Sequence, residues 1–240
     1  MLRVFHCGIL ERQSIIRLDP KEAHHLFRVL RAGDGEKVAI LDGCGRYAEG
    51  HIVDRKTQEI AIDDLHFARG SRIALYPALL KSGAMDFLIR EATAIGVGAI
   101  IPLATEHAAV KMDVKMAAKK QLHWNNIARE ACKQSGNPVL PAIELPQKIE
   151  QIDFARPTFL AALRQPTTDL FRHESAVKSG AINLIIGPEG DFSEREYRLF
   201  SEKNAHFIRL GPHILRAETA ALYLLSAVDY LRARTDDANT

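Results

Sequence analysis

Short apolar runs alternate with helical stripes along most of the chain after residue 70. Apolar residues without alternation predict buried strands at residues 72–77, 99–103, 158–163, 181–186 and 206–210. Apolar residues at helical spacing predict helices over residues 85–95 and 115–134, from Ser193, and after Pro212. Ser193 and Glu196 have the spacing of a capping box. This alternation is typical of an α/β fold, a mostly parallel sheet with helices on both faces.

The N-terminal part has a different pattern, in which short strands are separated by turns. Strands are predicted at residues 14–18, 37–41, 46–53 and 59–62. Asp19 and Pro20 predict a helix start, because Asp is a favoured N-cap and Pro fits the first helical position; we expect this helix to end at Gly33. Residues 64–70 are interpreted as a polar linker. The sequence therefore predicts a β-rich domain over residues 1–70 and an α/β domain over residues 71–240.

Composition narrows the class of protein only in part. Of the 240 residues, 47% are apolar and 26% are charged, which indicates a soluble globular chain. The net charge of +2 neither requires nor excludes a nucleic-acid partner. Three dispersed cysteines favour a reduced, cytoplasmic location over disulfides or a zinc site. No signal peptide and no membrane-spanning run is recognised, so we expect no membrane association. We also expect no metal, because the cysteines are dispersed and the adjacent His24 and His25 would point in different directions on a helix.

Two glycine-containing loops follow predicted strands and precede predicted helices. The first is Ile186-Gly187-Pro188-Glu189-Gly190-Asp191, and the second runs from Leu210 to Ala220 with the sequence LGPHILRAETA. In open α/β sheets ligands bind at the carboxyl ends of strands, and glycine lets a backbone approach a ligand closely. The loops are therefore a candidate site for a flat heterocycle. Two ordinary strand-to-helix turns are the alternative, which composition alone favours.

The two loop motifs together resemble the RsmE family of 16S ribosomal RNA methyltransferases, a branch of the SPOUT superfamily. The N-terminal segment HLFRVLRAGDGEKVAILDG is similar to the PUA-like barrel of that family, and the likeness covers nearly the whole chain. The resemblance implies a SPOUT-type trefoil-knotted parallel sheet preceded by a small PUA-like β-barrel. The sequence departs from the family at several positions, namely Asp191 for Gly, His213 for Arg, Ala217 for Thr or Ser, and Lys133 and Asn137 for Glu and Arg.

The resemblance also implies an activity, S-adenosyl-L-methionine-dependent methylation of uridine N3 at position 1498 of 16S rRNA. The implied partners are 16S rRNA, within the 30S subunit, and a second copy of the chain, with the active site at the homodimer interface. Trp124 or the last helix is the candidate for that interface. Two alternatives stay open: a SPOUT methyltransferase for another rRNA or tRNA uridine, and a non-catalytic RNA-binding homologue.

Candidate site residues follow from the family's pattern. Cofactor contacts are expected at Leu163, Gly187, Gly190, Leu210, Gly211, Ile214 and Leu215. Uridine N3 carries a proton, so methylation needs a base or a group that stabilises the uridine anion. Arg216 is the first candidate, with Glu189 and Glu218 as possible bases; the structural alternative is an ion pair of Arg216 with either carboxylate. Candidate RNA phosphate contacts are Arg3, Arg12, Arg28, Arg31 and Arg46, and the alternative is ordinary surface charge.

Overall fold

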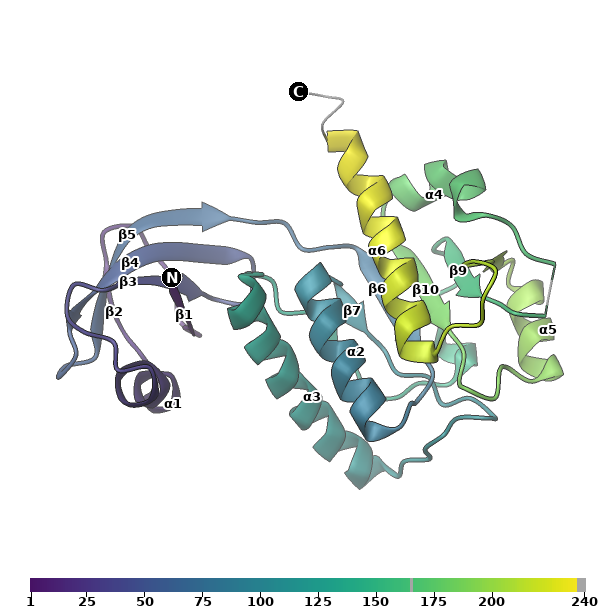
Figure 1. Cartoon of the computed structure of the whole chain (residues 1–240), viewed down its shortest axis with the longest axis horizontal. Coiled ribbons are helices and arrows are strands. Elements are labelled where there is room, and N and C mark those ends of the chain that lie inside the picture. Colours follow the sequence, from purple (N-terminus) through teal and green to yellow (C-terminus); the bar gives the residue numbers. More distant parts are fainter. Residues whose placement is uncertain (165, 237–240) are drawn as a thin grey trace. The chain divides into compact units, whose positions relative to one another are not determined.

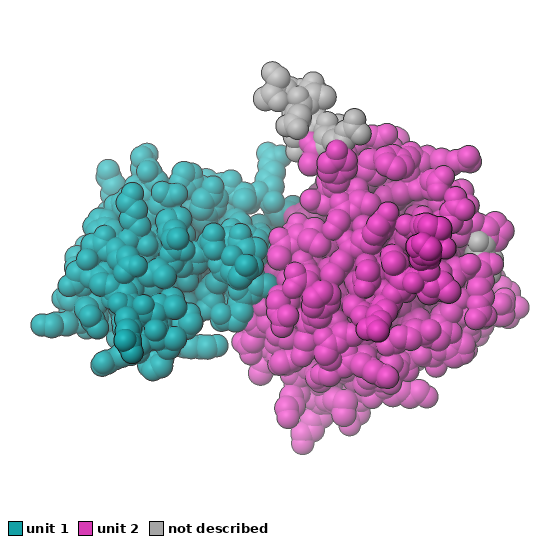
Figure 2. All heavy atoms as spheres, viewed as in Figure 1, with its two compact units in different colours: residues 1–70, 128–140 teal, residues 71–127, 141–240 magenta. Residues whose placement is uncertain are grey.

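The structure is a computed structural model that describes residues 1–164 and 166–236. Figure 1 traces the chain, and Figure 2 colours its two compact units. The first unit consists of Met1–Gly70 together with Ala128–Leu140. The second unit contains Ser71–Ile127 and the chain from Pro141 onward. Residues 128–140 therefore belong to the first unit, although nothing in their local sequence pattern indicates it.

The first unit is built on a five-stranded sheet with the order β1-β3-β4-β5-β2. Strands β1 and β3 are parallel and the other neighbours are antiparallel. The predicted linker is wrong in its first half, because β5 continues to Phe67 and pairs with β4 along its whole length. Strand β1 was not predicted. The strands are β1 (Leu2–Phe5), β2 (Ile15–Arg17), β3 (Lys37–Leu41), β4 (Arg46–Asp54) and β5 (Glu59–Phe67).

One short helix packs on this sheet. Helix α1 (Pro20–His24) starts where the sequence predicts, because the Asp19 side chain accepts hydrogen bonds from the backbone N–H groups of Lys21 and Glu22. The chain then widens into the π-helix η1 (His25–Val29), so the helix ends before Gly33. Leu26 and Phe27 are buried in the core of this unit. Together with the curled sheet, this arrangement is consistent with a PUA-like barrel.

The second unit contains a six-stranded sheet with the order β11-β9-β10-β6-β7-β8, in which every neighbouring pair is parallel. The predicted parallel α/β sheet is thereby confirmed. All residues of the central strand β10 are buried, which explains its run of apolar residues without alternation. The strands are β6 (Ile73–Pro77), β7 (Ala99–Ile100), β8 (Ala142–Ile143), β9 (Thr158–Ala161), β10 (Ile182–Ile186) and β11 (His206–Ile208).

Helices cover both faces of this sheet. Helix α6 (Ala217–Asp236) lies against β6 and β10 and also packs on α2 (Ser82–Ile95), as Figure 1 shows. On the opposite face, Tyr197 and Phe200 of α5 (Glu194–Glu202) pack in a cluster with Ile185. The capping box of Ser193 and Glu196 starts α5 as predicted. The knot that the resemblance implies stays a prediction.

The remaining helices are α3 (Val114–Ser135), η2 (Ile149–Gln151), η3 (Leu170–His173) and α4 (Glu174–Lys178). The sequence predicted α3 but neither η3 nor α4. Trp124 of α3 is only 1% exposed, and its indole N–H donates to Asp86 Oδ1 over 3.2 Å. Trp124 is therefore a core residue, and its candidacy for a dimer interface is wrong.

Candidate active site

A pocket of about 490 Å³ opens where the two glycine-containing loops meet, at the carboxyl ends of β9, β10 and β11. Strands β9 and β11 end two residues earlier than predicted, so Leu163 and Leu210 lie in the loops that follow them. The pocket is lined by residues 161–163, 167, 186–189, 191, 209–217 and 220. Two loops that the sequence separates are thus brought together at the edge of the sheet where parallel folds bind ligands.

Most of the predicted cofactor residues line this pocket. They are Leu163, Gly187, Leu210, Gly211, Ile214 and Leu215; Gly190 is absent from the lining. Leu163 is 60% exposed and Ile214 is 80% exposed. Exposed apolar side chains in the lining of a concave site are typical of a pocket that covers the faces of an apolar or aromatic ligand.

Packing of the first loop explains its two glycines. A Cβ atom on Gly187 would lie 2.9 Å from Cε2 of Phe192, and a Cβ on Gly190 would lie 3.2 Å from Cβ of His107. Phe192 is itself buried against the rings of Tyr197 and Phe200. A larger side chain at position 187 would therefore disturb this aromatic cluster, besides any effect on a ligand.

Asp191 closes the same loop in a backbone conformation that favours glycine, with φ 64°. Its carboxylate Oδ1 accepts a hydrogen bond of 2.7 Å from the Tyr197 hydroxyl and one of 2.9 Å from the Phe192 N–H. Burial raises the pKa of Tyr197, and the hydrogen bond to Asp191 raises it further. The sequence did not indicate Tyr197, because nothing in the motif refers to the helix that follows it.

The candidate catalytic residues differ in their positions. Arg216 and Glu189 are exposed and line the pocket, whereas Glu218 lies outside the lining, in the first turn of α6. Among the residues that the structure describes, no ion pair joins Arg216 to Glu189 or Glu218. The guanidinium is therefore not held by the structural pairing that sequence reasoning kept as the alternative.

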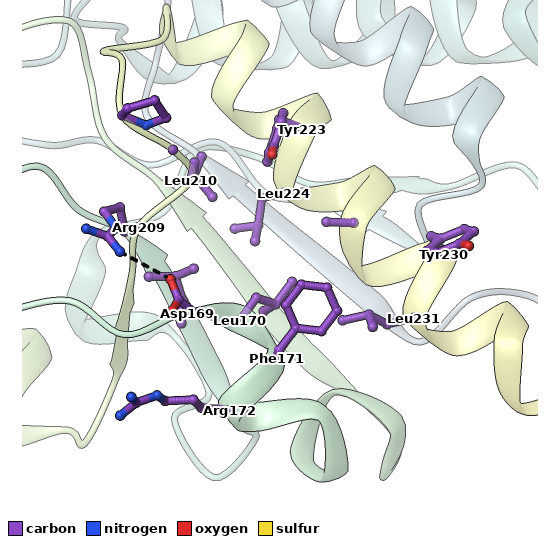
Figure 3. Close-up of a pocket in the computed structure, with 14 residues that line it drawn as sticks. Asp169, Leu170, Phe171, Arg172, Arg209, Leu210, Tyr223, Leu224, Tyr230 and Leu231 are labelled. Carbon is purple, nitrogen blue, oxygen red and sulfur yellow. Dashed lines mark ion pairs between the residues drawn. The ribbon is translucent and has the colours of Figure 1, made fainter.

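A second hollow of about 700 Å³ adjoins the first and shares residues 209–212 with it. Figure 3 shows its walls, with Tyr223 and Tyr230 projecting from α6 and Phe171 opposite them. An ion pair of 3.5 Å between Arg209 and Asp169 lies at one side. The three aromatic side chains are 54–68% exposed. This aromatic surface was not predicted, because η3 and α6 meet only in the folded chain.

The candidate RNA-binding arginines all lie in the first unit, in different settings. Arg3 donates to the backbone carbonyls of Lys133 and Gln134 at the end of α3, and Arg12 pairs with Asp64 at 2.7 Å. Arg28, Arg31 and Arg46 are exposed. Arg28 also lines a shallow hollow of about 780 Å³ with His24, Arg55 and Lys56. Sequence reasoning missed Arg55 and Lys56 because they lie in a polar turn.

Two other classes of site are not found in the described chain. No group of three or more His, Cys, Asp or Glu side chains is arranged to hold a metal ion in residues 1–164 and 166–236. Within the same residues, no helix is long and apolar enough to cross a membrane.

Comparison with known proteins gives the family. Residues 69–229 match the model of an RNA methyltransferase domain, and residues 18–63 match that of an RNA methyltransferase PUA domain. Ribosomal RNA small subunit methyltransferase E 2 of Borreliella burgdorferi is 33% identical over 231 residues, which covers 94% of this chain and 93% of the relative. Ribosomal RNA small subunit methyltransferase E of Bacillus subtilis is 28% identical and covers 92% of each chain.

Solved structures agree with this assignment. A ribosomal RNA small subunit methyltransferase E from Neisseria gonorrhoeae, bound to S-adenosyl methionine, matches with a TM-score of 0.83 and 26% identity over 96% of this chain and 98% of that one. A putative methyltransferase from Legionella pneumophila, in complex with the cofactor SAM, matches with a TM-score of 0.84 and 29% identity over 95% and 97% of the two chains. The chain therefore belongs to the ribosomal RNA small subunit methyltransferase E family.

Proposed function

We propose that this chain transfers a methyl group from S-adenosyl-L-methionine to N3 of uridine 1498 in 16S rRNA, which is the activity of its family. The observation that carries the proposal is the position of the pocket. Both family motifs meet there, at the ligand-binding edge of a parallel sheet, and they supply most of its lining. The family match over most of the chain supports the same conclusion.

The residues of the pocket fit this cofactor. Its volume of about 490 Å³ lies in the range of small-molecule sites. Leu163, Leu210 and Ile214 would cover the faces of the adenosine, while backbone groups of the loops around Gly187 and Gly211 would bond its polar edges. The protein itself leaves the apolar side chains of Leu163 and Ile214 exposed, and a bound ligand of this kind would cover them.

When bound, the cofactor supplies a methyl group made electrophilic by its sulfonium sulfur. The residues of this chain must hold uracil N3 in line with that methyl and accept the N3 proton. Glu189 is the exposed carboxylate in the lining, so we propose that it accepts the proton from uracil N3. Arg216 lies in the same lining without a carboxylate partner among the described residues, and its guanidinium would stabilise the negative charge on the deprotonated uracil. Glu218, in the first turn of α6, would favour that helix electrostatically.

The first unit is the proposed RNA-binding module. Arg28, Arg55 and Lys56 line one basic hollow, and no carboxylate is part of that lining. Phosphate contacts from such residues fix the orientation of an RNA without reading its sequence. Arg31 and Arg46 remain exposed candidates, whereas Arg3 and Arg12 are already engaged within the protein. We expect the 30S subunit to be the substrate and the cytoplasm to be the location.

A homodimer is the proposed assembly. The hollow in Figure 3 adjoins the cofactor pocket and exposes Tyr223, Tyr230 and Phe171, which a second copy would cover. Sedimentation of the purified chain tests the assembly directly. We expect the wild-type chain to be a dimer and the Tyr230→Asp variant to be a monomer. A monomeric wild-type chain would contradict the proposed assembly.

Calorimetry and methyl transfer together test the proposed function. We expect wild-type protein to bind S-adenosyl-L-methionine, and folded Ile214→Asp protein to bind it much more weakly, because the charge would enter the apolar wall. Labelled cofactor should then methylate 30S subunits that lack the modification. If the methyl group is transferred to tRNA instead, the chain is a methyltransferase for a different uridine. If the chain binds RNA but not the cofactor, it is a non-catalytic RNA-binding homologue.

A further inference from the structure

Asp191 stands at the end of the first loop in a backbone conformation that favours glycine. The Asp191 N–H donates to the Pro188 carbonyl over 2.9 Å, which closes a turn, and Asp191 has φ 64°. Glycine adopts this conformation without strain, while Asp is only tolerated in it. An aspartate kept in such a turn indicates that its side chain makes contacts that offset the strain.

Those contacts fix the carboxylate in one orientation. Oδ1 accepts from the Tyr197 hydroxyl at 2.7 Å and from the Phe192 N–H at 2.9 Å. Oδ2 is buried and receives no hydrogen bond within the described chain; its nearest cation is Arg164 Nε at 3.4 Å. The Arg164 side chain is 72% exposed, so this pair contributes little. The strong contact of Asp191 is therefore the one with Tyr197.

Tyr197 connects the loop to the opposite wall of the pocket. Its side chain comes from α5, is 2% exposed and packs against the rings of Phe192 and Phe207. The backbone of Leu163, beyond the end of β9, lies close enough to the phenol to lower the pKa of Tyr197, against the larger effect of burial. The Tyr197 hydroxyl thus lies between the Leu163 backbone and the Asp191 carboxylate to which it donates. On the far side of the turn, the Asp191 carbonyl is 3.0 Å from His107 Nδ1.

We propose that Asp191 and Tyr197 are a positioning pair that sets the distance between two walls of the cofactor pocket, the Leu163 segment and the loop of residues 187–191. The inference rests on the proposed binding of S-adenosyl-L-methionine. Leu163 is 60% exposed, so side-chain packing does little to hold its segment in place. The buried Tyr197, held by its hydrogen bond to Asp191 and placed beside the Leu163 backbone, supplies that restraint before the ligand arrives, which reduces the entropy lost on binding.

Calorimetry with S-adenosyl-L-methionine on four variants tests the pair. Tyr197→Phe keeps the ring and removes the hydroxyl, and we expect the Kd to rise about tenfold. Asp191→Ala should weaken binding at least as much. Asp191→Asn should restore affinity to within about threefold of wild type, because the amide oxygen still accepts from Tyr197 and Asn tolerates a positive φ. Tyr47→Phe, which removes a hydroxyl in the first unit, is the matched control.

Each variant is checked by circular dichroism, and only folded protein is compared. A loss of general stability leaves the Kd of a folded protein unchanged, so it does not mimic the expected pattern. The double variant of Tyr197→Phe and Asp191→Ala should bind no more weakly than the poorer single variant. Wild-type affinity in folded Tyr197→Phe, or an Asp191→Asn variant as weak as Asp191→Ala, would overturn the positioning role. Absence of binding by the wild-type chain would instead overturn the proposed function.

Discussion

Lys133 Nζ lies 3.2 Å from Glu22 Oε1, and the two side chains are only 9% and 3% exposed. The other oxygen of Glu22 accepts a hydrogen bond from the Phe5 N–H. Lys133 also pairs with Glu130 at 2.8 Å. These contacts join α1 to residues 128–140 within the first unit, although 111 residues separate the partners in sequence. Lys133 thus supplies the cation that the buried carboxylate of Glu22 needs.

Removing that cation should destabilise the first unit strongly. Lys133→Met leaves the Glu22 carboxylate buried beside an apolar side chain, and we expect the free energy of unfolding to fall by about 3–5 kcal/mol. Adding Glu22→Gln should recover part of the loss, because the amide oxygen still accepts from Phe5. Urea unfolding measures both effects. A cost below about 1 kcal/mol for Lys133→Met would show that solvent reaches the carboxylate.

The stability of the second unit should depend on pH through His206. Burial lowers the pKa of His206, and the nearby His173, whose ring centroid is 4.3 Å away, lowers it further. The unfolded chain then takes up a proton below its ordinary pKa, while the folded chain does not. The contribution of His206 to stability is therefore complete above about pH 6.5 and declines as the pH falls toward the folded pKa.

Thermal unfolding at pH 7.5 and at pH 5.5 measures this dependence. His206→Gln should lose less stability between the two values than wild type. His6, whose pKa burial also lowers, gives a second contribution of the same sign in the first unit, and His6→Gln separates it. An identical pH response in wild type and His206→Gln would contradict the role given to His206.

The open apolar wall of the pocket should affect binding more than folding. Leu163→Ala and Ile214→Ala remove exposed side chains, so the free energy of unfolding should change by about 0.5 kcal/mol or less. Each should raise the Kd for S-adenosyl-L-methionine about tenfold, because its apolar contact with the ligand is lost. Calorimetry and urea unfolding of the same samples provide the test, and unchanged affinity in both variants would remove this wall from the site.

Gly187→Val is a less specific probe of the pocket than Ile214→Ala, although its side chain would also fill space next to a ligand. The added side chain would first meet the ring of Phe192, which is 2.9 Å from the Cβ position. We therefore expect the variant to lose stability as well as cofactor binding, and a lower unfolding midpoint distinguishes it from Ile214→Ala.

Arg216 should matter for the chemical step more than for cofactor binding. Arg216→Ala is expected to slow methyl transfer about 100-fold or more, because a preorganised donor for the uracil anion is lost. Arg216→Lys should not restore the rate fully, since an ammonium lacks the planar fork of the guanidinium. Single-turnover methylation of 30S subunits measures the rate, with Arg198→Ala, on the exposed side of α5, as a control. Full activity of Arg216→Ala would exclude this assignment.

Much of the fold could be predicted because it leaves a local signature. Strand β3, the N-cap at Asp19, the capping box at Ser193 and the end of α2 at Gly96 all depend on residues within a few positions of one another. Long-range features leave no such pattern. Strand β5 continues into a polar segment only because β4 pairs with it, and residues 128–140 join the first unit through partners such as Glu22.

The candidate site also combines features with a local sequence motif and features that depend on long-range contacts. Its two loops were predicted from motifs, and the structure brings Leu163, Gly187, Ile214 and Arg216 to one pocket. Tyr197 could not be predicted, because its role depends on a hydrogen bond across the pocket wall. The basic hollow and the aromatic hollow also combine residues from separate elements, which no single stretch of sequence contains.

Identification of the modified nucleoside tests the central claim most directly. 30S subunits that lack the modification are incubated with the protein and S-adenosyl-L-methionine, and the 16S rRNA is digested and analysed by mass spectrometry, with Arg216→Ala protein as the control. The account predicts 3-methyluridine at position 1498, formed by wild-type protein and strongly reduced with the variant. Methylation at another nucleoside, or no methylation by a wild-type protein that binds the cofactor and the subunit, would contradict it.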